Sequence, residues 1–360
     1  MILFRYVAVR ALLATLAAQA GVLAIYLAID FVDNASAFAG PGWGRAVLEL
    51  YANKSAVVAY QTAPAALVLG AAIAASGFRQ TREWTALRSV GLGPWRLAVP
   101  ILGVALLVGG SMALLNDVVG VHAAERAEEI QATRFQRGGS ARRWEAVRQP
   151  KRWFRSPDGR RIYHLRGQRA GGGFEGATIL EVDAEFRLVR RIDASSMSPA
   201  ERGWSLTDVE DRRFLADGSV RLESAAERRY DFAEPPEAFA LVAGRPVQMR
   251  YSVLNEQIHL RRQLGQHVAE FELERNGRGS AALVGVPAAL LALALALRAN
   301  RKGHIAAALV EAVGISLLLW SMQGTALAMG LSGRAPPVVA AWAPVLVFAA
   351  AGIVALRRVR

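Results

Sequence analysis

The fold is decided by LAVPILGVALLVGGSMALL at residues 97–115 and SAALVGVPAALLALALAL at residues 280–297, two apolar stretches that bracket a polar insert. A helix needs about 20 mostly apolar residues to cross the core of a bilayer. Six stretches meet this requirement: Ala11–Ile29, Ser55–Ser76, Leu97–Leu115, Ser280–Leu297, Ile305–Leu331 and Val338–Leu356. The sequence therefore predicts an α-helical membrane protein with six transmembrane helices. Its predicted domains are residues 1–115, 116–279 and 280–360.

Lysines and arginines in the short loops predict the orientation, because they concentrate on the cytoplasmic side. Six spans put both termini, the loop between spans two and three and the loop between spans four and five on one side. These segments hold one acid, Glu83, and twelve basic residues: Arg5, Arg10, Arg79, Arg82, Arg88, Arg96, Arg298, Arg301, Lys302, Arg357, Arg358 and Arg360. The opposite short loops hold only Arg45, Lys54 and Arg334, with acids among them. We expect the termini in the cytoplasm and the insert outside.

The formal net charge of +13 follows largely from this loop pattern, so it does not indicate nucleic-acid binding. The chain has no cysteine, which excludes disulfides and thiolate metal sites. Two arginines precede the first apolar run, as in a signal peptide. The run continues to Ile29 without a small-residue cleavage site, so we expect a retained span.

The insert is predicted to be an all-β domain of the sandwich or jelly-roll kind. Pro157-Asp158-Gly159 and Ala216-Asp217-Gly218 are typical of reversals between strands. The expected strands are Arg152–Arg155, Arg160–Leu165, Thr178–Val182, Leu188–Ala194, Trp204–Glu210, Arg213–Leu215 and Val220–Leu222. Helical segments at 122–134 and 252–275 are expected to join the domain to spans three and four.

Motifs of catalysis are absent from the sequence. It has no phosphate-binding loop of the G-x-x-x-x-G-K-[ST] type, no H-E-x-x-H and no nucleophile elbow, and its five histidines lack the spacing of zinc ligands. We expect no enzyme activity, no metal and no cofactor in this chain. Glu311 within span five, and Asp30 and Asp33 at the outer end of span one, are expected to meet a polar cavity, a neighbouring helix or interfacial water.

The loop between spans two and three has the clearest local pattern, FRQTREWTALRSVGLGPWR at residues 78–96. Thr81 is expected to cap a short helix, and Gly91 to end it. Trp84, Leu87 and Val90 fall on one helical face. Such a helix either lies on the membrane surface or docks in a groove of a partner, and the residues alone favour neither.

The segment Arg82–Gly91, followed by Trp95 and Arg96, resembles the coupling-helix segment of the lipopolysaccharide export permeases, the LptF/LptG family. Leu188–Ile192 in the insert resembles a family pattern too, as does the stretch from Gly330 through Pro336-Pro337 to Pro344. The arrangement of three spans, a β-domain and three spans matches along essentially the whole chain. Phe31-Val32-Asp33 and Pro336-Pro337 look more like the LptG branch.

The resemblance implies a subunit of an ABC transporter. Two permeases, this chain and an LptF-like one, would pair around a cavity, and a cytoplasmic LptB-like ATPase dimer would hydrolyse ATP. Lipopolysaccharide would be extracted from the inner membrane and passed to a periplasmic bridge of LptC/LptA-like jelly rolls. By the same resemblance, the ATPase would bind the coupling helix at Arg82, Glu83, Trp84, Leu87, Arg88 and Gly91.

LptG members often carry lysines beside the Phe-Val-Asp segment, whereas this chain has Asp30, Asn34, Ser36 and Ala37. Either other cations such as Arg126 and Arg134 bind the lipid phosphates, or the glycolipid differs. The alternative for the two arginines is that they pair with Glu125, Glu128 or Glu129 along a solvated helix. The acyl chains would enter between spans one and five. The residues predicted to line this entrance are an apolar wall of Tyr26, Leu27, Tyr60, Leu319, Trp320 and Met322, with the acid Asp30 beside it. The alternative is a permease or scaffold of another envelope lipid or lipoprotein system.

Overall fold

The chain was analysed in a computed structural model. The structure describes residues 2–38, 42–135, 152–156, 158–168, 173–200, 203–215, 217–232, 234, 239, 246–263, 267–298 and 305–359. Contacts divide the chain into two compact units. One, the helical unit, comprises residues 1–136, 246–251 and 269–360; the other, the β-unit, comprises residues 137–245 and 252–268.

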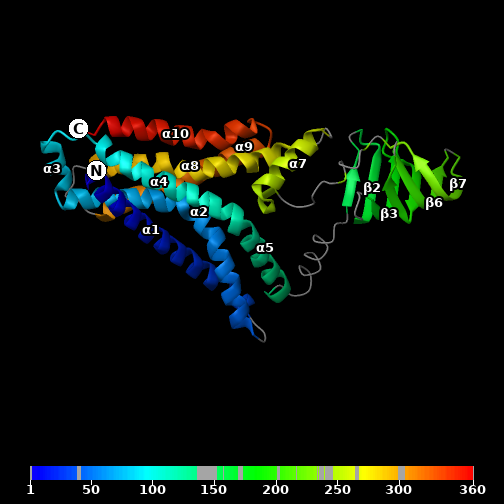
Figure 1. Ribbon diagram of the computed structural model, residues 1–360, viewed down its shortest axis with the longest axis horizontal. Coiled ribbons are helices and arrows are strands. Elements are labelled where there is room, and N and C mark those ends of the chain that lie inside the picture. Colours follow the sequence, from blue (N-terminus) through cyan, green and yellow to red (C-terminus); the bar gives the residue numbers. More distant parts are fainter. Residues whose placement is uncertain are drawn as a thin grey trace. The chain divides into compact units, whose positions relative to one another are not determined.

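The helical unit contains six helices long and apolar enough to cross a membrane, as the sequence predicted. Its helices are α1 (Ile2–Asn34), α2 (Trp43–Gln80), α3 (Glu83–Ser89), α4 (Trp95–Leu115), α5 (Val121–Ile130), α8 (Ala269–Arg298), α9 (Ile305–Leu331) and α10 (Pro337–Arg357). Span three continues from α4 through a π-helical turn at Asn116–Gly120 into α5 and a second such turn at Gln131–Phe135. Both termini and α3 lie at one end of this unit (Figure 1).

The centre of the bundle is formed by α2 and α8. In each, 61% of the apolar window is buried, against 11% for α1. Small residues let the backbones approach closely, as is common between membrane helices. A Cβ on Gly109 of α4 would lie 2.3 Å from the carbonyl oxygen of Ala282, and a Cβ on Gly70 of α2 would lie 2.3 Å from Oγ1 of Thr15 in α1. Close packing therefore joins α2, α4 and α8, and α1 packs on α2 and α4 with most of its surface exposed.

The β-unit contains one antiparallel sheet of seven strands, which confirms the prediction of a β-domain between spans three and four. The strands are β1 (Arg152–Arg155), β2 (Arg161–Gln168), β3 (Phe174–Val182), β4 (Leu188–Ala194), β5 (Ser196–Pro199), β6 (Trp204–Phe214) and β7 (Val220–Tyr230). They pair in the order β1-β2-β3-β4-β6-β5, with β7 on β6 and a further contact between β3 and β5. Because β3 pairs with both β4 and β5, the sheet bends around its apolar face.

Three predictions in this region were wrong. The expected strand Arg213–Leu215 is not separate, because β6 continues through Asp211 and Arg212 to Phe214. The short strand β5 was not expected, because its sequence SMSP has four residues, one of them proline, and none that is β-branched or aromatic. The helix expected at 252–275 is two helices, α7 (Tyr251–Gln263) and α8. Both expected turns are present, with Gly159 and Gly218 at positive φ; Pro157 and Ala216 lie outside the described residues.

Aromatic side chains fill the inner face of the sheet. Tyr163, Phe174 and Trp204 are almost completely buried, and Phe239 packs against all three with ring centroids 5.2 to 5.8 Å away. The indole of Trp204 donates a hydrogen bond to the carbonyl oxygen of Glu234 at 2.9 Å. Burial of such large rings is the main stabilising contribution to a small β-domain.

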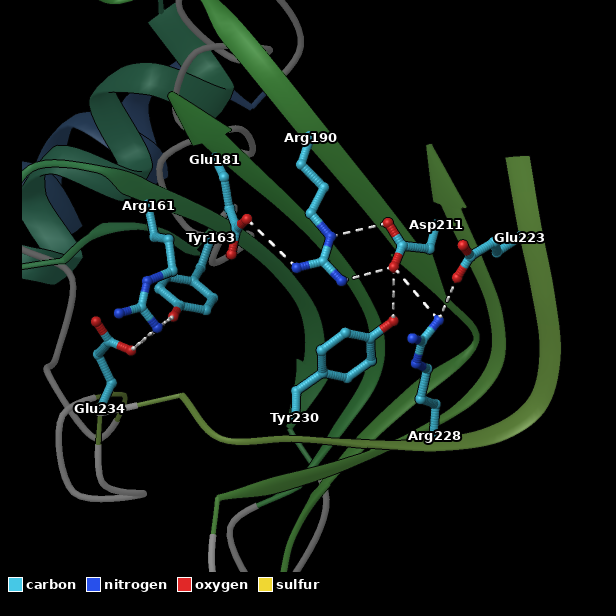
Figure 2. A network of polar contacts seen from close by, with 9 residues as sticks. All are labelled: Arg161, Tyr163, Glu181, Arg190, Asp211, Glu223, Arg228, Tyr230 and Glu234. Carbon is cyan, nitrogen blue, oxygen red and sulfur yellow. Dashed lines mark hydrogen bonds and ion pairs between the residues drawn. The ribbon is translucent and has the colours of Figure 1, made fainter. Parts of the chain in front are cut away.

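A network of charges crosses strands β4, β6 and β7, as Figure 2 shows. Arg190 donates two hydrogen bonds to Asp211, at 2.9 and 2.6 Å, and Tyr230 donates a third at 3.3 Å. Asp211 is only 1% exposed. The hydrogen bonds from Arg190 hold the pKa of Asp211 below its ordinary value, although burial opposes them. Asp211 is therefore charged and paired when the domain is folded.

The seam between α1 and α2 is tested by adding one methyl group. Gly70→Ala should lower the thermal unfolding midpoint of the full chain in detergent, since overpacking costs about 1–3 kcal/mol. Gly77→Ala is the matched control on the same helix, because nothing lies within 4 Å of its Cβ position. The control should be neutral or slightly stabilising through helix propensity. Equal midpoints for the two variants would contradict the close contact with Thr15.

Asp211→Asn should destabilise the β-unit by about 2 kcal/mol at pH 7, because Arg190 loses the charge that its hydrogen bonds compensate. A carboxyl whose pKa is lowered by folding stabilises the fold above its unfolded pKa of about 3.9 and loses this effect as the pH falls through the folded value. The difference in stability between wild type and variant should therefore shrink below pH 4. Thermal unfolding from pH 7 to 3 checks this, with the exposed Glu175→Gln as control. A difference in unfolding midpoint that does not change with pH would contradict the ion pair of Arg190 with Asp211.

Candidate functional site

Helix α3 follows α2 after a sharp turn at Arg82, whose φ is +60°. The last residue of α3 is Ser89, and Gly91 stops the helix as predicted: its φ is +84° and its N–H donates to the carbonyl oxygen of Arg88 at 2.9 Å. The prediction that Thr81 caps α3 was wrong. Its hydroxyl donates to the carbonyl oxygen of Gly77 at 3.0 Å and so closes the end of α2, while Arg82 occupies the N-cap position without a capping side chain.

The apolar residues of α3 face in different directions. Trp84 is 6% exposed and belongs to the core of the helical unit, and Leu87 packs against that core. Val90, predicted on the same face, is 79% exposed. The outward surface of α3 consists of the exposed residues Arg82, Thr85, Ala86, Arg88, Ser89 and Val90. Trp84 and Leu87 therefore attach the helix to the bundle, and the residues of the outward surface are exposed.

Glu83 is held by two side chains of α1. Arg10 binds its carboxylate with nitrogen to oxygen distances of 2.9 and 3.2 Å, and the hydroxyl of Tyr6 donates to it at 3.0 and 3.2 Å. The guanidinium of Arg10 also lies 5.4 Å from the ring centre of Tyr6 and 5.1 Å from that of Phe78. Sequence reasoning counted Arg10 only as a topology signal, and nothing in the sequence places it beside a residue 73 positions away.

Two opposing effects act on the pKa of Glu83. Burial alone would raise it, but hydrogen bonds from neighbouring side chains, Tyr6 and Arg10 among them, outweigh burial and lower the pKa below its ordinary value. The side chain of Glu83 is still 31% exposed. A carboxylate thus stays available at the edge of the outward surface of α3 while its inner side is bound to α1.

At the other end of α1, Asp30 is paired rather than free. The amine of Lys54 lies 2.6 and 2.7 Å from its carboxylate oxygens, and the hydroxyl of Tyr51 donates to it at 2.8 Å. An aromatic cluster of Phe31, Phe38, Tyr51 and Phe135 surrounds this pair. The charge of Asp30 is therefore compensated by an ion pair and a hydrogen bond. The sequence analysis did not consider Lys54, the cation of this pair, for phosphate binding.

The two predicted phosphate-binding arginines lie in different surroundings. Arg126 binds Glu49 of α2 at 2.7 Å and Glu129 at 2.9 Å, so two carboxylates already surround it. Arg134 is exposed and forms no ion pair within the described part of the chain. Arg134 is therefore the better placed of the two to meet an anion.

The residues predicted for an apolar wall do not share one surface. Leu319 is fully buried and Met322 packs against the core, while Tyr26 and Trp320 are 42% and 43% exposed. The remaining member on α1, Leu27, is half-buried. Helix α1 packs on α2 and α4, whereas α9 packs on α2, α8 and α10. A lipid passage between spans one and five therefore cannot be lined by these six side chains of one chain together.

Tyr60 lines a cavity of about 310 Å³ among α2, α5, α8, α9 and α10. The wall is mostly apolar and includes Gln61, Gln323 and Leu327. Arg278 lies at this cavity, 10% exposed, and is held by Glu274 at 2.8 Å and Asp117 at 3.3 Å. Its charge is thus neutralised within the helical unit, which is how a buried arginine is tolerated there.

Among the described residues no cluster of histidine, aspartate and glutamate is arranged to hold a metal ion. Comparison with curated proteins gave no match to the chain. The sequence profile of a family described as lipopolysaccharide export system permease LptF/LptG matches residues 5–358, nearly the whole chain. The match does not distinguish the LptG branch from the LptF branch. With six membrane helices, an inserted antiparallel β-domain and this match, the chain belongs to the LptF/LptG family of lipopolysaccharide export permeases.

Proposed function

We propose that this chain is a permease subunit of an ABC transporter that extracts lipopolysaccharide from the inner membrane and passes it to a periplasmic bridge. Family membership supports transport of lipopolysaccharide. The observation that carries the ATPase partnership is α3, a short helix attached by Trp84 with an outward surface that no core residue covers. The dimeric LptB-like ATPase would dock there and hydrolyse ATP, and this chain would supply no catalytic group.

The outward surface of α3 suits a groove of a partner better than a membrane surface. A helix that lies on a bilayer buries its large apolar side chains in the lipid. In α3 the tryptophan points into the bundle, and the outward surface has two arginines and small residues beside Val90. Glu83 at its edge offers a charge that a partner arginine would bind.

The ATPase should be lost when charge on this surface is changed. Glu83→Arg should reduce recovery of the ATPase with the tagged, membrane-inserted permease, because reversing a docked charge costs about 2–5 kcal/mol. Thr85→Arg should reduce it too, because it places a long charged side chain in the docking surface. Thr85→Arg leaves the contacts of Glu83 with α1 untouched, so it separates docking from packing. Arg334→Glu, in the loop before α10, is the control and should retain the ATPase. Normal recovery from both α3 variants would rule out this docking surface.

The substrate path begins, in this proposal, at the outer ends of α1 and α5. Two permeases would form the cavity, since α1 packs on α2 and α4 of its own chain while α9 packs on α2, α8 and α10. The phosphorylated head group would meet Arg134, and the acyl chains would meet the exposed apolar sides of α1 and α9, including Tyr26 and Trp320.

The β-unit would then form part of the bridge. Its edge strands β1 and β7 offer unpaired backbone groups to a jelly roll of LptC/LptA type. Its interior is filled by its own aromatic rings, so an acyl chain must displace side chains such as Phe239 to enter. Photo-crosslinkers along β1 and β7 are expected to capture a periplasmic partner more readily than crosslinkers in the interior capture lipid.

Arg134→Ala should lower the lipopolysaccharide that co-purifies with the transporter, because an arginine binds phosphate with two parallel hydrogen bonds. Arg134→Lys should recover only part of the loss, since lysine keeps the charge but not the forked geometry. Arg126→Ala is the comparator and should have a smaller effect on lipid, as Glu49 and Glu129 already occupy Arg126. Wild-type lipid content in Arg134→Ala would exclude its head-group role.

A further inference from the structure

Helix α1 is long and mostly exposed. Its 33 residues span about 50 Å at the rise of an α-helix, and only 11% of its apolar window is buried. Its buried residues Val7, Ala11 and Thr15 lie in the inner half and pack against the bundle, and polar contacts are added further along the helix. The side chain of Gln19 binds Thr62 at 2.9 Å in the middle, and Asp30 binds Lys54 at the outer end.

At the inner end, the attachment is to α3 and not only to the bundle core. Tyr6 and Arg10 are one helical turn apart and converge on Glu83, the first residue of α3. Phe78, the last buried residue of α2, lies under both, with its ring 6.0 Å from that of Tyr6. Because one carboxylate receives hydrogen bonds from two α1 side chains, α3 cannot rotate or move away without breaking this cluster.

We propose that Tyr6 and Arg10 are positioning residues for the coupling helix, which hold Glu83 so that α3 and the inner end of α1 move together. The proposal rests on the proposed function, because it assigns to this cluster the transmission of ATPase movement from α3 to α1. The outer end of α1 carries Asp30 and Tyr26, where the lipid path is proposed. A single long helix thus connects the ATPase side with the lipid side.

The decisive variants change α1 and not α3. Arg10→Ala removes the ion pair, Tyr6→Phe removes only the hydroxyl, and Arg5→Ala is the matched control, an exposed arginine on the same helix. Each is prepared as the assembled complex of permeases and ATPase in nanodiscs of phosphatidylethanolamine and phosphatidylglycerol. Two quantities are measured: hydrogen exchange of the amides in residues 82–92, and ATP hydrolysis with and without added lipopolysaccharide.

Arg10→Ala should accelerate exchange in residues 82–92 and leave both ATPase recovery and basal hydrolysis at wild-type levels. It should lower the stimulation of hydrolysis by lipopolysaccharide at least about fivefold, the lower range of coupling between distant sites. Tyr6→Phe should show a smaller change of the same sign, and Arg5→Ala none. A merely structural role would alter exchange without altering stimulation, and that result would overturn the transmission role. Unchanged exchange in Arg10→Ala would overturn the cluster itself.

A charge exchange separates the two roles of Glu83. Arg10→Glu combined with Glu83→Arg should restore slow exchange in residues 82–92, since the ion pair reforms with reversed polarity, while the ATPase stays absent because its docking charge is reversed. Hydrogen exchange in the double variant as fast as in Arg10→Ala would contradict the pairing of residues 10 and 83. A wild-type complex without any associated ATPase would instead overturn the proposed function, and the exchange measurements on the permease would still decide whether the cluster exists.

Discussion

The cost of placing polar groups in hydrocarbon governs this structure. In a bilayer, backbone groups must find partners within the chain, so spans are helices, and ionisable side chains must be paired. The helical unit contains pairings of this kind: Asp30 with Lys54, Arg278 with Glu274 and Asp117, and Arg10 with Glu83. Glu274 is four residues from Arg278 in α8, whereas the other pairs join different helical segments. The ion pairs that make charged side chains tolerable in the bilayer therefore also connect the helices to one another.

The two units are stabilised in different ways. In the helical unit, small residues such as Gly70 and Gly109 allow close backbone contacts, and apolar surface remains exposed along α1 and α9. In the β-unit, large aromatic rings fill the inner face of the sheet, and the ion pair of Arg190 with Asp211 links β4 to β6. The exposed apolar sides of α1 and α9 are suited to lipid and to a second permease. The closed interior of the β-unit is not suited to lipid without rearrangement.

Sequence reasoning predicted the elements well and the contacts poorly. Hydropathy predicted all six spans, and Ile305–Leu331 coincides with α9 because both of its ends are polar or glycine-rich. Strand β5 was missed because SMSP is only four residues long and contains proline and no β-branched or aromatic residue, and β6 was divided at Asp211-Arg212, where charged residues interrupt the pattern. For the site, periodicity placed Trp84, Leu87 and Val90 on one face. It could not show that the bundle covers only the first two, nor that Arg10 reaches Glu83, because neither follows from local spacing.

The central claim is that α3 and the β-unit lie on opposite sides of the membrane, so that one faces an ATPase and the other a periplasmic bridge. The natural chain has no cysteine, so single cysteines report location directly. Val90→Cys in α3 and Val220→Cys in β7 replace residues that are 79% and 52% exposed. A membrane-impermeant maleimide added to intact spheroplasts should label the cysteine at position 220 and not the one at position 90, and inverted vesicles should give the reverse. Labelling of both positions from the same side would contradict the account.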